Sequence, residues 1–290
     1  MIKVLIVGAD GQMGQCFKTL ASNITDLEFL FTGKQALDIL NINQLNTIFN
    51  LENPNFVVNC AAYTAVDLAE DNEEIAQHIN EIGAQNLALA CKQYNATLIH
   101  LSTDFVFEGN VVKLLNETDF VKPKSVYGST KLAGERAIQS ALDKHIIIRT
   151  SWLYSEYGNN FLKTMLYLSK TKSELNIIAD QIGTPTYAMD LANAILCIIR
   201  SEKQTLGIFH YSNEGVTSWY DFAVAIFKLA KIKIQVNPIP NTAYPTKASR
   251  PSFSVMDKSK IKQTYDLEIP HWLESLELCM ERLSAEGKIV

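Results

Sequence analysis

Short apolar runs alternate with longer helical patterns along the first half of the chain, and this alternation restricts the fold more than any other feature. The expected strands cover residues 3–8, 28–31, 56–61, 97–102 and 145–150. Between them, residues 12–21, 73–94 and 127–142 have the period of helices. Strands that alternate with helices form a parallel sheet with right-handed crossovers. We therefore predict an α/β fold with a doubly wound parallel sheet of the Rossmann type.

The regular alternation ends near residue 150. Beyond it, helical patterns at residues 161–168, 187–200 and 218–229 are separated by loop-like stretches at 155–160, 180–186 and 237–252. A chain of 290 residues suits one large domain or two unequal lobes. We predict a dinucleotide-binding domain over residues 1–150 and a smaller, partly interleaved, mainly substrate-binding lobe over residues 151–290, with some segments returning to the first domain.

The composition excludes several classes of function. A net charge of -5 and the lack of a Lys/Arg-rich tract argue against nucleic acid as a partner, because phosphate binding needs clustered cations. No apolar run reaches the roughly 20 residues that span a bilayer, and the apolar start is too short for a signal peptide. We expect a cytoplasmic location, no membrane partner, and either a monomer or a homodimer.

The cysteines and histidines do not form a ligand pattern. The five cysteines are odd in number and scattered, which suits reduced thiols. The five histidines show no paired spacing, and none lies near a cysteine at the spacing of a zinc finger. We therefore expect no structural metal.

A glycine-rich turn follows the first predicted strand and opens the first predicted helix. Its glycines, Gly8, Gly11 and Gly14, are three residues apart, which lets the backbone approach a pyrophosphate at the helix N-terminus. A glycine triple also suits an ordinary strand-to-helix turn. Its position at the end of the first strand favours dinucleotide binding.

The end of the second strand should contact the adenosine ribose. A site for NAD usually has an acid there, whereas a 2'-phosphate prefers hydroxyls and cations. The strand ends with Thr32 and Lys34 and has no acid. This predicts NADPH, held through Thr32 and Lys34, with NADH as the alternative. Asp38 either reaches the adenine amino group or caps a turn.

Two further strand ends carry small or polar residues. Residues 59–67 are mostly small, which lets a flat cofactor lie against the backbone, although close loop packing explains them equally well. Ser102, Thr103 and Asp104 place two hydroxyls and an acid where the sheet opens. A hydroxyl there can polarise a substrate carbonyl for hydride attack, although a Ser-Thr pair at a strand end is usually a turn former.

Tyr127 and Lys131 lie four residues apart in a predicted helix and so share one face. A nearby cation favours phenolate, which would lower the tyrosine pKa from roughly 10 towards neutrality. The lysine could also hold a ribose hydroxyl and relay the proton. Chance supplies this spacing almost once in a chain of this composition, but of the 11 tyrosines only Tyr127 has it.

Taken together, these motifs resemble the extended short-chain dehydrogenase/reductases. Later stretches are similar to the dTDP-4-dehydrorhamnose reductases within that group. The resemblance implies NADPH-dependent reduction of the 4-keto group of dTDP-4-dehydro-L-rhamnose to dTDP-L-rhamnose. The stretches that carry it are Thr64-Ala65-Val66-Asp67, Arg149-Thr150-Ser151-Trp152, Gly158-Asn159-Asn160-Phe161, Asp180-Gln181-Ile182-Gly183-Thr184-Pro185-Thr186 and Tyr244-Pro245-Thr246, with Arg250-Pro251.

The resemblance also implies roles for single residues. The catalytic set is Thr103, Tyr127 and Lys131. Arg250 is the candidate for the substrate diphosphate, by its charge and fork geometry. Trp152 is either an apolar wall for the deoxysugar or a core residue. Positions that match cofactor contacts are Gly11, Gln12, Met13, Asp38, Ile39, Ala61, Ala62, Thr64, Tyr127 and Lys131. Positions that match sugar contacts are Val66, Thr103, Asp104, Phe105, Tyr127 and Trp152.

The chain departs from the family pattern at two places. Some members form a dimer through a magnesium ion held by acidic side chains, and this chain has Gln15 and Cys16 where one of those acids would lie. A magnesium-bridged homodimer is therefore in doubt. Phe105 stands where the family often has tyrosine, so one sugar contact would lose its hydroxyl and keep its apolar packing.

Two other functions compete with reduction. A nucleotide-sugar epimerase shares the fold and the Tyr-Lys pair but keeps its NAD bound and returns the hydride. A non-catalytic relative, such as the regulatory subunit of methionine adenosyltransferase, keeps the architecture for binding. The missing acid after the second strand and the region around Trp152 argue against the first, and the complete set of Thr103, Tyr127 and Lys131 argues against the second.

Overall fold

The computed structural model describes residues 1–203, 205–285 and 287. Within them, a central sheet of six strands has the order β10-β5-β4-β3-β1-β2, and each neighbouring pair is parallel. The predicted doubly wound parallel sheet is confirmed. The strands are β1 (Ile2–Val7), β2 (Leu27–Thr32), β3 (Phe56–Asn59), β4 (Thr97–Thr103), β5 (His145–Thr150) and β10 (Gly207–His210).

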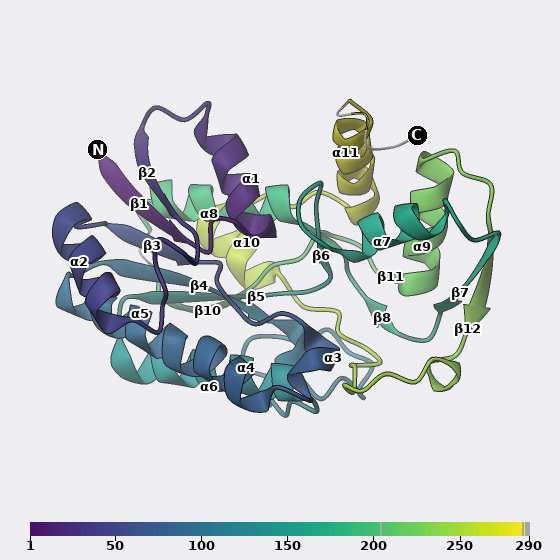
Figure 1. Cartoon of the computed structure of the whole chain (residues 1–290), viewed down its shortest axis with the longest axis horizontal. Helices are drawn as coiled ribbons and strands as arrows, with labels where there is room; N and C mark the ends of the chain where they lie inside the picture. The colour runs from purple at the N-terminus through teal and green to yellow at the C-terminus, as the bar shows by residue number, and fades with distance from the viewer. Residues whose placement is uncertain (204, 286, 288–290) are drawn as a thin grey trace.

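Helices cover both faces of this sheet (Figure 1). On one face α1 (Gln12–Ala21) packs against α8 (Ala188–Arg200). On the other lie α2 (Ile42–Glu52), α5 (Gly83–Gln93) and α6 (Val126–Ala141). The inner strands are mostly apolar because alternate residues enter two different cores: Val4 and Ile6 face one, Leu5 and Val7 the other.

The predicted helix over residues 73–94 is interrupted. It consists of α4 (Glu73–Gln77), a π-helical turn (His78–Ile82) and α5. Asn80 in this turn is buried: its Oδ1 accepts from the Tyr63 N–H at 2.8 Å, and its Nδ2 donates to the Thr130 hydroxyl at 3.0 Å. The turn thus links the loop after β3 to α6. Such turns often occur at functional sites.

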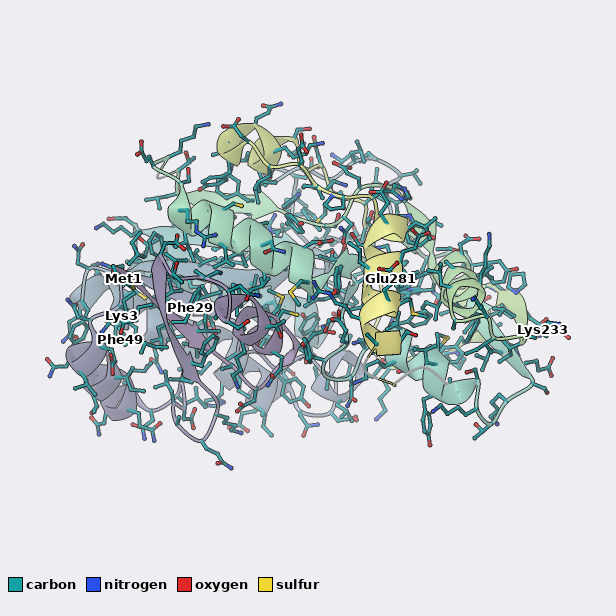
Figure 2. The ribbon with its side chains drawn as sticks, turned by 90° about the horizontal axis from the view of Figure 1, so that it is seen from above. Met1, Lys3, Phe29, Phe49, Lys233 and Glu281 are labelled. Carbon is teal, nitrogen blue, oxygen red and sulfur yellow. The ribbon has the colours of Figure 1, made fainter. Side chains whose placement is uncertain are left out.

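A second lobe lies beside the sheet (Figure 1). Helix α7 (Phe161–Leu168) packs against α9 (Trp219–Leu229), and a parallel pair is formed by β7 (Glu174–Ile178) and β12 (Gln235–Ile239). Seen from above, the last helix, α11 (Trp272–Ala285), which carries Glu281, lies between the sheet and the far end of this lobe at Lys233 (Figure 2). The chain returns from this lobe to the first part of the molecule, because α8 packs against α1 and β10 pairs with β5 in the central sheet.

Several short elements were not predicted, and one of them, β8, lies within the stretch 180–186 that we expected to be a loop. Strand β6 (Leu153–Tyr154) pairs with β9 (Thr186–Tyr187), and β8 (Ile182–Gly183) pairs with β11 (Thr217–Ser218). Further helices are α3 (Val66–Ala69) and α10 (Ser259–Tyr265). The described part of the chain has no helix long and apolar enough to cross a membrane.

A buried ion pair fastens α6 to the sheet. Glu135 on α6 accepts from Arg149 on β5, with Nη2–Oε2 at 2.7 Å and Nε–Oε1 at 2.9 Å. The Ser102 hydroxyl on β4 donates to the same carboxylate at 2.5 Å. Both charged side chains are almost fully buried, at 1% and 3% exposure. Each charge therefore depends on the other for compensation.

Replacement of Glu135 by glutamine should destabilise the protein strongly. Glu135→Gln leaves the Arg149 guanidinium buried without its anion, which costs about 3–5 kcal/mol. Urea denaturation would measure the loss. Asp26→Asn is the matched control, because it breaks the exposed pair of Asp26 with Arg200 and should leave the unfolding midpoint unchanged. Equal midpoints for the two variants would contradict this prediction.

Candidate active site

Close packing at the start of α6 positions Tyr127. The Ser125 hydroxyl caps the helix by accepting from the Gly128 N–H at 3.1 Å. A Cβ at Gly128 would lie 2.3 Å from the Phe105 carbonyl oxygen, so only glycine lets the helix approach the 3-10 turn Asp104–Val106. As a result, the rings of Phe105 and Tyr127 meet edge to face, with centroids 5.5 Å apart.

Thr103 ends β4 next to Tyr127. It is buried, and its hydroxyl donates to Asp104 Oδ1 at 3.1 Å and accepts from the Phe105 N–H at 3.2 Å. The Thr103 side chain also lies close enough to Tyr127 to act on the pKa of the phenol, which it lowers. The structure therefore brings together Thr103, Asp104, Phe105 and Tyr127, which are four of the residues predicted to contact the sugar.

The predicted lowering of the Tyr127 pKa is wrong. Burial raises the pKa of Tyr127 to about 12, and this outweighs the opposing effect of Thr103, while Asp104 adds to the rise. Lys131 is on the same helix face, but its Nζ donates to the Leu101 carbonyl at 2.6 Å and lies 3.2 Å from His100 Nε2. A raised pKa keeps the phenol protonated, as a proton donor must be.

The pKa of Lys131 is also shifted by its surroundings. It is 2% exposed, and burial lowers its pKa to about 8, against the carboxylate of Glu135 and the thiol of Cys60, which raise it. An amine with this pKa exchanges its proton near neutrality. The spacing of Tyr127 and Lys131 predicted the shared face correctly, whereas the partners of Lys131 come from β4.

A cavity of about 410 Å³ lies at the carboxyl ends of β1 and β3. Gly8 has φ +80°, and a Cβ there would be 2.7 Å from the Ala61 nitrogen, so the turn after β1 needs glycine to meet the loop after β3. Helix α1 begins after Gly11 without a side-chain cap, which leaves its first N–H groups for an anion. The predicted cofactor residues that line this cavity are Gly8, Gly11, Lys34, Asp38, Ile39, Ala61, Ala62 and Thr64.

Other predicted cofactor residues do not line this cavity in the described structure. A Cβ on Gly14 would be 2.4 Å from Ala9 Cα, so this glycine serves packing of the helix on the turn. Met13 is buried in the core. The Gln12 amide binds the loop after β6, with its Oε1 accepting from Asn160 Nδ2 at 2.8 Å.

The residues expected to bind the adenosine end of the cofactor differ in their positions relative to the cavity. The Thr32 hydroxyl is buried in the sheet and donates to the Ile6 carbonyl at 3.2 Å, which does not favour the predicted contact with a 2'-phosphate. Lys34 lines the cavity and has no ion pair among the described residues. Asp38 also lines the cavity and, as one of its two expected roles, caps a turn by accepting from the Leu40 N–H at 3.0 Å.

A larger cavity of about 900 Å³ opens between α7, α9, β7, β12 and the loops beside them. Arg250 lines it and is held by two hydrogen bonds to Asp67, at 3.0 and 2.6 Å, which lower the Asp67 pKa. Asp67 borders this cavity, and Ala65, two residues earlier, borders the smaller one. The segment around Val66 therefore lies between the two cavities.

Trp152 is half-buried and stacks on Trp219, with ring centroids 3.6 Å apart and an interplanar angle of 10°. Its φ of +47° is a strained conformation for a large residue. Trp219 lines the 900 Å³ cavity, and Trp152 does not. The sequence analysis had no signal for Trp219, because its contact with Trp152 joins residues far apart in the chain.

His100 and Asn80 were not predicted as site residues, and Asn59 was predicted only as the start of the loop after the third strand. For His100 the sequence did offer a signal, because it is a polar side chain inside an otherwise apolar strand. The described residues hold no group of three or more His, Cys, Asp or Glu side chains that could bind a metal. All five cysteines carry free thiols, and Cys16 is buried.

Nearly the whole chain matches known proteins. The family model described as the RmlD substrate binding domain matches residues 2–285. A curated dTDP-4-dehydrorhamnose reductase from Aggregatibacter actinomycetemcomitans is 40% identical and covers 96% of this chain and 98% of its own.

Two solved structures named dTDP-4-dehydrorhamnose reductase superpose closely. The Clostridium acetobutylicum structure has a TM-score of 0.93 at 41% identity, over 98% of this chain and 100% of its own. The Bacillus anthracis structure, a complex with NADP, has a TM-score of 0.92 at 38% identity, over 97% of this chain and 100% of its own.

Asp104 should make the stability of the protein depend on pH. Burial raises the pKa of Asp104 to about 6, against hydrogen bonds from Ser254 and Thr103, whereas an unfolded Asp has a pKa near 3.9. The folded state therefore holds this proton more tightly, and the stabilisation present below about pH 4 is lost as the pH rises through about 6.

In Asp104→Asn this dependence should disappear. Between pH 4 and 7 the free energy of unfolding of the wild type should fall by about 2 kcal/mol relative to the variant. Urea denaturation of both proteins at the two pH values would measure this difference. A difference that stays constant with pH would contradict the burial of this carboxyl.

Proposed function

The chain belongs to the family described as the RmlD substrate binding domain, and on that premise we propose that it is an NADPH-dependent oxidoreductase that reduces dTDP-4-dehydro-L-rhamnose at its 4-keto group to dTDP-L-rhamnose. The observation that carries the proposal is the placement of the Tyr127 phenol beside Thr103, at the end of β4. The names of the relatives support this substrate.

In this proposal the chain supplies a proton and orients the carbonyl. The nicotinamide cofactor supplies the hydride when it is bound. Tyr127, whose pKa is about 12, donates its proton to the substrate oxygen as negative charge develops there. The Thr103 hydroxyl turns from Asp104 to hydrogen-bond the same oxygen. The ring of Phe105 restricts the orientation of the phenol.

The smaller cavity fits the cofactor. The glycine turn and the uncapped start of α1 suit a pyrophosphate. Lys34 is the cation available for a 2'-phosphate. The loop from Ala61 to Thr64 offers a flat backbone surface, and Lys131 would hold a ribose hydroxyl. We therefore propose NADPH, with NADH as the weaker alternative.

The larger cavity is the proposed place of the nucleotide diphosphate part of the substrate. Arg250 and Lys172 line it with positive charge, and Trp219 adds an aromatic surface. Asp67 already neutralises part of the Arg250 charge, so Arg250 acts in an ion pair and Lys172 adds a second cation. Val66, Phe105 and Trp152 stay the proposed contacts of the deoxysugar.

The competing functions make different demands on the cofactor. A reductase consumes one NADPH for each sugar reduced, whereas an epimerase returns its hydride and a binding protein transfers none. The curated relatives favour the reductase over the epimerase. A cytoplasmic location is part of the proposal, supported by the five free cysteines.

Tyr127→Phe should remove the proton donor. We expect kcat to fall by about 10²–10⁴-fold, since this is the usual contribution of a general acid. Loss of NADPH absorbance with enzymatically prepared dTDP-4-dehydro-L-rhamnose would measure the rate. Tyr167→Phe, at an exposed tyrosine on α7, is the control and should keep the wild-type rate. No sugar-dependent oxidation by the wild type would refute the reductase, and equal rates in both variants would refute the role of Tyr127.

Lys34→Ala should separate the two cofactors. Loss of the cation removes a charge-assisted contact to the 2'-phosphate, so KM for NADPH should rise about tenfold or more. KM for NADH, which lacks this phosphate, should stay unchanged. Equal changes for the two cofactors, or a wild type that works better with NADH, would contradict the role of Lys34.

A further inference from the structure

Three buried side chains form a hydrogen-bonded chain beneath the proposed active site. Asn59 on β3 and His100 on β4 are cross-strand neighbours, with Asn59 Nδ2 3.0 Å from His100 Nδ1. The other ring nitrogen of His100, Nε2, is 3.2 Å from Lys131 Nζ. Each of the three side chains is no more than 2% exposed. Water therefore cannot replace any of these partners, and the protons must be arranged within the chain itself.

The orientation of Asn59 decides which nitrogen of His100 carries the proton. Asn59 Oδ1 accepts from the Ala61 N–H at 3.0 Å, so its Nδ2 must face the imidazole. An amide nitrogen can only donate, and His100 Nδ1 must therefore accept. A neutral imidazole with an accepting Nδ1 has its proton on Nε2. Turning the amide to reverse this assignment would set Nδ2 against the Ala61 N–H.

This tautomer has a consequence for Lys131. The Nε2–H of His100 points at Nζ, and an ammonium group has no lone pair to accept it. A neutral amine has one, and it still donates to the Leu101 carbonyl at 2.6 Å. We propose that Asn59 and His100 together favour the neutral amine form of Lys131 over its ammonium form, which makes both of them positioning residues for the catalytic set.

The surrounding charges agree with this assignment. Burial lowers the pKa of His100 well below its usual range, so the ring is neutral. Glu135 and Cys60 face Lys131 from α6 and from the loop after β3. The Glu135 carboxylate is already neutralised by Arg149, and burial keeps Cys60 protonated by raising its pKa.

The chain of hydrogen bonds also reaches the proposed cofactor cavity. Ala61, which fixes Asn59, lines that cavity. To become an ammonium without a clash, Lys131 needs the Asn59 amide to turn and release the Ala61 N–H. The charge of Lys131 is thus coupled to the loop that would hold the cofactor. This consequence for catalysis rests on the proposed function, whereas the tautomer itself does not.

Asn59→Asp tests the tautomer directly. A carboxylate of the same shape accepts from both the Ala61 N–H and the imidazole, so the His100 proton should move from Nε2 to Nδ1. NMR of the full-length protein with isotope-labelled histidine distinguishes the two tautomers, and His100→Gln identifies the signal. We expect Nε2–H in the wild type and Nδ1–H in Asn59→Asp. A wild-type signal from Nδ1–H would overturn the proposal, whatever the enzyme does with its substrate.

The pH dependence of turnover tests the effect on Lys131. The apparent pKa assigned to Lys131 should rise by about one unit or more in Asn59→Asp and in His100→Gln. In the second variant the glutamine amide oxygen accepts from Nζ without adding charge. His210→Gln is the matched control, because His210 is equally buried but binds the Leu115 carbonyl, and it should keep the wild-type profile. Profiles that shift equally in all three variants, or only in Asn59→Asp, would contradict the proposal.

Discussion

The position of the candidate active site depends on the buried ion pair between Glu135 and Arg149. Helix α6 carries Tyr127 and Lys131, and this pair connects the helix to β5, while Ser102 connects it to β4. Because an unpaired buried charge is costly, the helix cannot slide along the sheet without breaking all three contacts. Thr103 follows Ser102 directly, so the same network fixes the distance between the hydroxyl and the phenol.

Burial then selects the protonation states of the side chains around that network. It raises the pKa values of Tyr127 and Asp104 and lowers that of Lys131, in each case because the charged form loses hydration. The neutral forms are favoured as a result. A site of this kind is suited to give a proton to a developing alkoxide, and it differs from the larger cavity, where Arg250 and Asp67 remain charged.

The bounds of some helices and strands could be predicted to the residue, and those of others could not. The bounds of α1, α7 and β5 agree with the sequence patterns, because their apolar periods end at turn or capping residues. The π-helical turn inside residues 73–94 could not be predicted from the helical spacing of apolar residues, because it depends on contacts of Asn80 with two distant segments. The pair of β7 with β12 joins strands about 60 residues apart, which local patterns do not report.

The sequence by itself determined the parallel sheet, the glycine turn after β1, and the shared helix face of Tyr127 and Lys131. These features follow from local spacing and backbone stereochemistry. Only the tertiary structure decided how these groups ionise and what they contact: Thr32 turns into the sheet, Lys131 meets His100, and Trp152 stacks on Trp219. The physical reason is that a pKa and a hydrogen-bond partner depend on burial and on neighbours from other strands, which spacing along the chain does not encode.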